Sequence, residues 1–488
     1  MTVTQLEPQQ LLIGGSWKGA AGDRSFETTD PWTGDTAGSA AAAGRDEARA
    51  AAEAAGEAFR EWSQTPPSAR RELLQKAAGL LTERAPDIAA TVTQETGGTF
   101  GWGMFNCQLA AGMLGEAAAQ TTAVTGEVIP SDVPGLTAFG LREPAGVVVG
   151  IAPWNAPVIL GTRAVASPLA FGNTVVLKAS ELCPRTHGEI IRALVDAGLP
   201  PGAVNLITHD PGDAADVVDE LIAHPAVRRI SFTGSTRVGR IVAENAARHL
   251  KRVLLELGGK APLIVLADAD LDEAVAAANF GAFMHQGQVC MATERIVVEH
   301  PVADAFAQQL GERAGALTVG DPRDPETEIG PMVNRSALER VTALVDDAVQ
   351  RGARVVTGGE SEGPCYRPTV LTDVTPEMRI YHEESFGPVV GIMSVDGPEE
   401  AVRIANDTEY GLAASVFGGH VPTALDLIRQ IESGIGHVNG ATVHDEPQMP
   451  FGGVKASGWG RFGGKAAIEE FTELRWITVQ QGSRHYPL

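Results

Sequence analysis

Cysteine and aromatic residues are scarce in this sequence, which has 4 cysteines and 5% aromatic residues among 488 positions. The cysteines form no CxxC pair and show no cysteine–histidine spacing of the kind that binds zinc. They stand at Cys107, Cys183, Cys290 and Cys365. We therefore expect neither a disulfide framework nor a bound metal, and we expect the reduced thiols of a cytoplasmic protein.

Basic charge and long apolar runs are also scarce. The formal net charge of -23 argues against a nucleic-acid partner and against an anionic membrane surface, since both attract basic proteins. The first residues, Met1 to Pro8, have no basic start and no apolar core, so no signal peptide is expected. The longest apolar run, 145–160, is interrupted by Pro153 and Pro157 and is too short to span a bilayer.

The chain is long enough for two or three domains, and its 44% apolar and 20% charged residues are typical of a globular enzyme. Apolar spacing predicts N-terminal helices at Arg45–Trp62, Ser68–Glu95 and Thr99–Gln120. From Gly146 onward, predicted strands alternate with predicted helices. The strands are at 147–152, 174–178, 204–208, 229–233 and 253–257, and the helices near 157–171, 184–198, 213–223 and 235–249. This alternation predicts an α/β protein with a parallel sheet, as in dinucleotide-binding folds.

A second α/β pattern runs from Pro262 to about Gly440. Its predicted strands are near 262–266, 295–299, 354–357, 388–395, 413–417 and 436–439. A hairpin-like segment at 125–142 and a strand-like tail at 474–480 do not fit either pattern. A terminal strand often pairs with another element or subunit, so these two segments predict an arm that forms oligomers.

One strand–helix junction could bind an anion. The ordinary GxGxxG fingerprint is missing, and Phe232–Gly239 stands in its place. Gly234 and Ser235 open the following helix, where free backbone N–H groups attract phosphate. The alternative is a plain capped helix with Ser235 at its N-cap.

Cys290 is the candidate nucleophile. It follows the helix-like stretch Leu271–Phe283 and precedes the strand-like run Arg295–Glu299, so its loop is held between two rigid elements. The alternative is an inert buried thiol, which is the usual state of an unpaired cysteine.

Several polar residues at turns could assist such a thiol. Glu256 ends a predicted strand and is followed by two glycines, which let another group approach the backbone closely. Asn155 lies between two prolines at the carboxyl end of a strand, where open α/β sheets bind ligands. Glu384 and Phe386 precede a Gly-Pro turn. Taken singly, each could be an ordinary turn or cap residue.

Taken together, these segments resemble the aldehyde dehydrogenase superfamily along nearly the whole chain. The matching motifs are Pro153-Trp154-Asn155, Lys178-Ala179-Ser180-Glu181, Phe232-Thr233-Gly234-Ser235, Glu256-Leu257-Gly258-Gly259-Lys260, Gly287-Gln288-Val289-Cys290, Glu384-Ser385-Phe386-Gly387-Pro388, Asn406–Gly411 and Pro450–Lys455. The resemblance implies a Rossmann-like NAD-binding domain, a second α/β catalytic domain and a small β arm. It places the NAD-binding domain at 1–122 and 144–257, the catalytic domain at 258–442, the arm at 123–143 and 473–488, and a return to the NAD-binding domain at 443–472.

The resemblance also implies a mechanism. Cys290 would attack the aldehyde as a thiolate, and the Asn155 amide and the Cys290 backbone N–H would stabilise the oxyanion. Hydride transfer would leave a thioester, and Glu256 would activate the water that hydrolyses it. Two alternatives remain: a CoA-acylating dehydrogenase, whose known examples generally lack this glutamate, and a non-redox thiol esterase, against which the cofactor motifs count.

The implied cofactor is NAD. The implied contacts are Trp154, Lys178, Glu181, Gly234, Ser235, Gly239, Leu257, Glu384 and Phe386. Of these, Trp154 and Ser235 would meet the pyrophosphate, and Lys178 and Glu181 the adenosine ribose. The Glu181 carboxylate would accept a ribose 2′-OH and repel a 2′-phosphate, which favours NAD. Lys178 could partly offset the repulsion, so NADP stays open.

The stretch Ile151–His187 is similar to aromatic aldehyde dehydrogenases, such as those for vanillin, salicylaldehyde and benzaldehyde. Ala156 would leave room for a flat ring beside the thiol, and Arg163 could hold a ring hydroxyl or carboxylate. The alternative for Arg163 is a surface arginine, since most arginines are exposed. Further candidate contacts, for each of which ordinary packing is the alternative, are Trp102, Met104, Phe105 and His444. An aliphatic aldehyde or ω-semialdehyde substrate remains the alternative, and a homodimer or homotetramer is expected.

Overall fold

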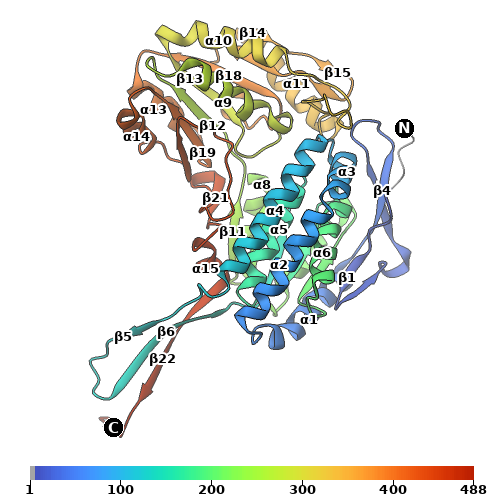
Figure 1. Ribbon diagram of the computed structural model, residues 1–488, viewed down its shortest axis with the longest axis vertical. Helices are drawn as coiled ribbons and strands as arrows, with labels where there is room; N and C mark the ends of the chain where they lie inside the picture. Colours follow the sequence, from blue (N-terminus) through green and yellow to red (C-terminus); the bar gives the residue numbers. More distant parts are fainter. Residues whose placement is uncertain (1–5) are drawn as a thin grey trace.

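Two sheets, each covered by helices, form the body of the molecule, and a narrow β arm extends from it (Figure 1). The structure is a computed structural model, and it describes residues 6–488. The first sheet has eight strands: β1 (Leu11–Ile13), β2 (Ser16–Lys18), β7 (Val147–Ile151), β8 (Thr174–Lys178), β9 (Val204–Ile207), β10 (Val227–Thr233), β11 (Arg252–Glu256) and β21 (Gly458–Trp459). Their order is β2-β1-β9-β8-β7-β10-β11-β21, and the strands from β9 to β11 run parallel. The predicted parallel sheet is confirmed.

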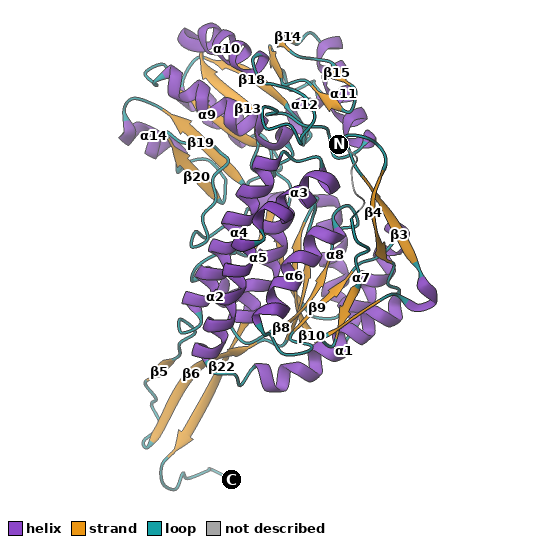
Figure 2. Cartoon of the chain, turned by 45° about the vertical axis from the view of Figure 1, so that its right-hand side comes forward, coloured by secondary structure: helices purple, strands orange, loops and turns teal. Residues whose placement is uncertain are grey.

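Helices cover both faces of this sheet (Figure 2). One apolar core includes residues of α2 (Pro67–Glu83), α3 (Ala85–Thr96), α4 (Phe100–Gln120), α5 (Pro157–Ala170) and α6 (Pro184–Ala197). The core on the other face includes residues of α1 (Arg45–Trp62), α7 (Ala214–Ala223) and α8 (Thr236–Arg248). The sheet is therefore buried on both sides, which explains its nearly continuous apolar strands.

One helix prediction was wrong. The stretch Ser68–Glu95 is not a single helix, because α2 ends at Glu83 and α3 begins at Ala85. Pro86 lacks a backbone N–H and is tolerated only in the first turn of a helix, so the chain must begin a new helix there. At the next junction Thr99 caps α4 by accepting a hydrogen bond from the Trp102 backbone N–H.

The second sheet has seven strands: β12 (Ala261–Val265), β13 (Thr293–Glu299), β14 (Arg354–Thr357), β17 (Thr369–Thr372), β18 (Val389–Val395), β19 (Ala413–Phe417) and β20 (Ile435–Val438). Their order is β14-β17-β18-β13-β12-β19-β20, and only the edge strand β14 is antiparallel to its neighbour. The helices of this part are α9 (Leu271–Phe283), α10 (His300–Gly315), α11 (Arg335–Gln350), α12 (Arg379–His382), α13 (Pro398–Asn406) and α14 (Val421–Ile428). The alternation did not predict β17.

The arm is a three-stranded antiparallel sheet of β5 (Glu127–Ile129), β6 (Leu136–Pro144) and β22 (Thr472–Gln480), in the order β22-β6-β5. β22 follows α15 (Ala466–Phe471) directly, so the chain leaves the body at this point. The hairpin β3 (Ser25–Thr29) and β4 (Thr36–Ala41) and the short pair β15 (Ser361–Glu362) and β16 (Cys365–Tyr366) complete the strands. Within residues 6–488, no helix combines the length and apolar character needed to cross a membrane.

Candidate active site

Two cavities meet at Cys290. The first, here called the Trp102 cavity, has a volume of about 240 Å³. The second, the Ser235 cavity, has a volume of about 220 Å³. Cys290 and Asn155 line both of them. A thiol in this position can reach molecules bound on either side.

The loop before Cys290 is fixed by its backbone shape and by hydrogen bonds. His285 and Gln286 have φ values of 50° and 55°, in the left-handed region that few side chains adopt. The Gln286 amide donates to the carbonyl oxygens of Gly97, at 3.1 Å, and Pro331, at 3.0 Å. The loop is thereby tied to the first part of the chain and to the segment that leads into α11.

Asn155 is buried and held by two contacts. Its side-chain amide donates to the backbone oxygen of Gln288 at 3.0 Å, and its own backbone oxygen accepts from the indole N–H of Trp102 at 3.0 Å. A side-chain amide has two N–H donors, and one of them is used by Gln288. The second donor can stabilise an oxyanion formed next to Cys290.

Glu256 lies beside Cys290 at the end of β11 and is 1% exposed. Burial raises the pKa of Glu256 to about 7, while the positive charge of Arg163 opposes the shift. Burial and the charge of Glu256 together raise the pKa of Cys290 well above its usual value. One carboxyl oxygen of Glu256 is buried without a hydrogen-bond partner among the described residues. The pair therefore combines a protonated thiol with a carboxyl group that can act as a base near neutral pH.

Six of the predicted cofactor residues line the Ser235 cavity together. They are Trp154, Gly234, Ser235, Leu257, Glu384 and Phe386. Ser235 also caps α8, because its hydroxyl oxygen accepts from the Val238 backbone N–H, so the capped-helix interpretation holds as well. Burial raises the pKa of Glu384 to about 8, and a hydrogen bond of 2.9 Å from the Gly259 backbone N–H opposes this rise.

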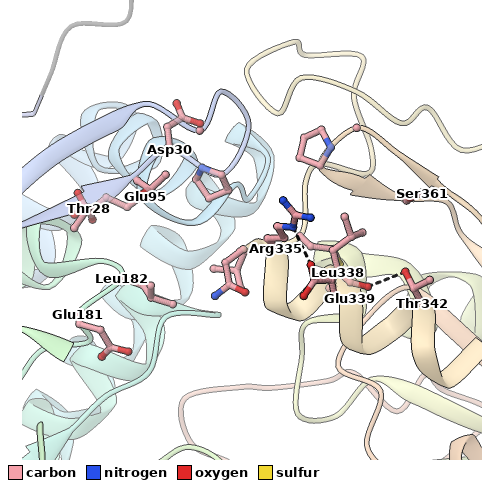
Figure 3. Close-up of a pocket in the computed structure, with 18 of the residues that line it drawn as sticks. Thr28, Asp30, Glu95, Glu181, Leu182, Arg335, Leu338, Glu339, Thr342 and Ser361 are labelled. Carbon is pink, nitrogen blue, oxygen red and sulfur yellow. Dashed lines mark hydrogen bonds and ion pairs between the residues drawn. The ribbon is translucent and has the colours of Figure 1, made fainter. Parts of the chain in front are cut away.

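The other three predicted cofactor residues lie outside this cavity. Gly239 packs against Leu257 so closely that a Cβ atom there would lie 2.4 Å from the leucine side chain. Lys178 ends β8 with its side chain buried, and burial lowers its pKa. Glu181 lines a larger cavity of about 860 Å³. In Figure 3, Glu181 lies on the side of that cavity opposite Leu338 of α11.

Most of the predicted substrate residues line the Trp102 cavity. They are Trp102, Phe105, Ala156, Arg163 and His444. Met104 instead packs against the neighbouring core. The interpretation of Arg163 as a surface residue is wrong, since its side chain is 6% exposed. Its guanidinium group binds Asp445 and lies 4.2 Å from the centre of the Phe451 ring, so part of its hydrogen-bonding capacity is already used.

Three contributors to the site were not predicted from the sequence. Asp445 is the ion-pair partner of Arg163 in the wall of the Trp102 cavity. Lys260 and Glu294 form a second buried ion pair, whose carboxylate accepts hydrogen bonds from the backbone of Ser385 and Phe386. Glu294 is the second residue of β13, and its charge in a buried strand was the signal that the sequence offered for this pair.

Comparisons with known proteins agree with this geometry. The model of the aldehyde dehydrogenase family matches residues 17–477. A vanillin dehydrogenase of Pseudomonas sp. (strain HR199) is 55% identical over 98% of this chain and 99% of that protein. A benzaldehyde dehydrogenase [NAD(+)] of Pseudomonas putida is 41% identical over 98% of this chain and 97% of that protein. A crystal structure of a salicylaldehyde dehydrogenase from Pseudomonas putida G7, complexed with salicylaldehyde, has a TM-score of 0.97 at 43% identity and covers 99% of this chain and 100% of that one.

Proposed function

Since the chain belongs to the aldehyde dehydrogenase family, we propose that it oxidises aromatic aldehydes to carboxylic acids with NAD as the electron acceptor. The family predicted from the eight motifs is confirmed, and the enzyme is an aldehyde dehydrogenase that uses a nicotinamide cofactor. The observation that carries the proposal is the position of Cys290 between a cavity lined mainly by aromatic and apolar side chains and a cavity lined by six of the predicted cofactor residues.

The Ser235 cavity suits a dinucleotide. Ser235 stands at the N-terminus of α8, where the helix dipole and free N–H groups favour a pyrophosphate. Glu384 can accept hydrogen bonds from ribose hydroxyl groups, and the Phe386 ring lines the same cavity. A bound nicotinamide supplies the acceptor for the hydride. Ser235, Glu384 and Phe386 would hold the cofactor so that its nicotinamide lies next to Cys290 and Asn155, which line the same cavity.

Glu256 would transfer the protons, and the Cys290 sulfur would form and break the covalent bond to the substrate. Glu256, directly or through a water molecule, takes the thiol proton, and the sulfur bonds to the aldehyde carbon. The free amide N–H of Asn155 then stabilises the resulting oxyanion. Loss of the hydride leaves a thioester on Cys290. Glu256 first releases the thiol proton to solvent and then accepts a proton from water, whose hydroxide attacks the thioester carbon. The carbon–sulfur bond breaks, Glu256 returns the proton to the sulfur, and the carboxylic acid leaves as the thiol is restored.

The shape of the Trp102 cavity favours an aromatic substrate. Trp102 and Phe105 stack at 5.6 Å on its wall, and Ala156 adds only a methyl group beside Cys290. A flat ring can pack against such aromatic faces, whereas a thin alkyl chain covers less of them. The two relatives named above, a vanillin dehydrogenase and a benzaldehyde dehydrogenase, support the same substrate class.

A substrate panel tests the proposal. Steady-state kcat/KM is measured with NAD for benzaldehyde and vanillin, and for propanal and succinate semialdehyde as aliphatic controls. We expect the aromatic aldehydes to have the higher values. A clear preference for either aliphatic aldehyde would overturn the aromatic assignment and favour the ω-semialdehyde alternative.

The two alternative reaction types are tested separately. A CoA-acylating enzyme would consume CoA and release an acyl-CoA, whereas the buried base Glu256 beside Cys290 favours hydrolysis. A non-redox thiol esterase would hydrolyse esters without forming reduced nicotinamide. Appearance of reduced nicotinamide and free acid in equal amounts, without CoA, supports the proposed reaction.

We further propose a cytoplasmic homodimer or homotetramer with the domain division that the resemblance implies. The arm exposes apolar side chains, with Val128 at 72% and Trp476 at 75% exposure, and a second subunit could cover them. The four cysteines are all free, which suits a reducing compartment. Sedimentation equilibrium tests the assembly, and a monomer at micromolar concentration would contradict it.

A further inference from the structure

Five aromatic rings form a continuous line between the two cavities. Phe105 and Trp102 stand 5.6 Å apart at 27°, and Trp102 and His285 stand 4.7 Å apart at 11°. His285 is then 6.5 Å from Trp154, which is 5.7 Å from Phe386. The first two rings line the Trp102 cavity and the last two line the Ser235 cavity. Of the five, His285 alone lines neither cavity, and it links the two pairs.

The imidazole of His285 makes its contacts through its faces. The side chain is 4% exposed, and neither ring nitrogen has a hydrogen-bond partner within residues 6–488. Burial lowers the pKa of His285 to about 3, so the ring is neutral at physiological pH. Its parallel stack on Trp102 is therefore its main interaction, and no role in proton transfer follows from its surroundings.

The local backbone explains why a histidine stands at this position. The φ value of His285 is 50°, a region in which asparagine, aspartate and histidine are enriched among residues other than glycine. Of these, only histidine carries a flat ring. Gly98 makes room for the stack, because a Cβ atom there would lie 2.8 Å from Cδ1 of Trp102 and 3.2 Å from Cε1 of His285. Position 285 thus combines a left-handed backbone with a planar side chain.

The stack bears on the active site through Trp102. The indole N–H of Trp102 donates to the Asn155 backbone oxygen at 3.0 Å, and Asn155 carries the oxyanion donor. We propose that His285 is a positioning and specificity-determining residue, which holds the Trp102 ring flat against the Trp102 cavity for an aromatic substrate and keeps Asn155 in place. This inference rests on the proposed oxidation of aromatic aldehydes.

Two substitutions separate the ring from the backbone. His285→Phe keeps a flat ring but is less suited to a positive φ, whereas His285→Asn suits the backbone and removes the ring. We expect His285→Asn to lower kcat/KM for benzaldehyde roughly three- to tenfold, the size of an aromatic pair contribution, and to lower it less for propanal. In His285→Phe the ratio of kcat/KM for benzaldehyde to kcat/KM for propanal should stay near that of the wild-type enzyme.

A double-mutant cycle tests whether the effect passes through Trp102. If it does, His285→Asn should change the benzaldehyde-to-propanal ratio little when Trp102→Leu is already present. An undiminished effect in that background would overturn the inference, as would an unchanged ratio in His285→Asn alone. An equal loss in the Asn and Phe variants at similar melting temperatures would show that a flat ring at position 285 does not set the preference, and would also overturn the inference.

A binding measurement distinguishes failure of this inference from failure of the proposed function. The dissociation constant of benzamide, an aromatic compound that is not oxidised, is measured by calorimetry for the unchanged enzyme and both variants. Weaker binding in His285→Asn but not in His285→Phe supports the positioning role. If the wild-type enzyme prefers propanal, the proposed function fails. Equal benzamide binding by the wild-type enzyme and both variants would instead overturn the role of His285.

Discussion

Lys260 and Glu294 form an ion pair that is almost fully removed from solvent. The Lys260 Nζ atom lies 2.5 Å from Oε2 of Glu294, and the two side chains are 0% and 3% exposed. The same carboxylate accepts hydrogen bonds from the backbone N–H groups of Ser385, at 2.8 Å, and Phe386, at 3.1 Å. The pair therefore fixes the segment that brings Glu384 and Phe386 to the Ser235 cavity.

Removing the carboxylate should destabilise the protein strongly. Glu294→Ala leaves the Lys260 charge buried without a partner, and we expect a loss of roughly 3–5 kcal/mol in the free energy of unfolding. Chemical denaturation measures it. The matched control is Glu339→Ala, since the Arg335–Glu339 pair is 89% and 64% exposed and should contribute at most about 1 kcal/mol. Equal losses in the two variants would contradict a structural role for the buried pair.

Cys290→Ala should abolish aldehyde oxidation, because it removes the atom that bonds to the aldehyde carbon. The fold and cofactor affinity should remain, since the contacts of the Ser235 cavity come mainly from other residues. Steady-state rates and NAD binding by calorimetry check both expectations. Cys365→Ala is the control, because Cys365 lines neither the Trp102 nor the Ser235 cavity among the described residues, and it should retain activity. Residual oxidation by the Cys290 variant would remove the thiol from its role.

Activity should fall as the pH drops below about 7. The pKa of Glu256 is raised to about 7, so the carboxyl group becomes protonated below this pH and can no longer accept a proton. In Glu256→Gln the loss of this base should slow the burst of reduced nicotinamide, in which the thiol is deprotonated, and should slow hydrolysis of the thioester more, so that the steady-state rate falls by roughly 100-fold or more. Pre-steady-state kinetics would show this, and an undiminished steady-state rate would exclude Glu256 as the base.

Local patterns predicted most strands of the two large sheets, and the motifs include Asn155 and Cys290, which line both cavities. The parallel strands were predicted from the alternation of apolar strand and helix patterns. Cys290 was identified from short local motifs. The Arg163–Asp445 and Lys260–Glu294 pairs were missed because the two partners of each pair stand in separate segments of the chain, and no local pattern links them. The strand Thr369–Thr372 was missed because four residues carry too little periodicity to be distinguished from a loop.

Glu181 should set the cofactor preference. Its carboxylate raises the pKa of the nearby Lys178, although burial lowers that pKa more. A 2′-phosphate placed beside Glu181 would be repelled, so NAD should be preferred over NADP. Glu181→Gln should reduce the ratio of kcat/KM for NAD to that for NADP by roughly tenfold, the effect of about 1.4 kcal/mol. Glu339→Gln, a carboxylate across the larger cavity, is the control. An unchanged ratio in the Glu181 variant would assign the preference to other residues.

Asp445, in the wall of the Trp102 cavity, should raise the pKa of the base Glu256. The negative charge of Asp445 raises the pKa of Glu256, and the positive charge of Arg163 lowers it. Asp445→Asn keeps a hydrogen-bond acceptor for Arg163 and removes only the negative charge. The pKa of Glu256 should then fall, so the acidic limb of the kcat/KM profile for benzaldehyde should move to lower pH.

The control for this shift is Glu446→Gln, which removes a neighbouring carboxylate whose side chain is 42% exposed and screened by solvent. The acidic limb of the kcat/KM profile of Glu446→Gln should stay at the same pH as in the wild-type enzyme. A limb that moves to higher pH in Asp445→Asn, or moves equally in both variants, would contradict the arrangement, because a buried negative charge near Glu256 can only favour its protonated form.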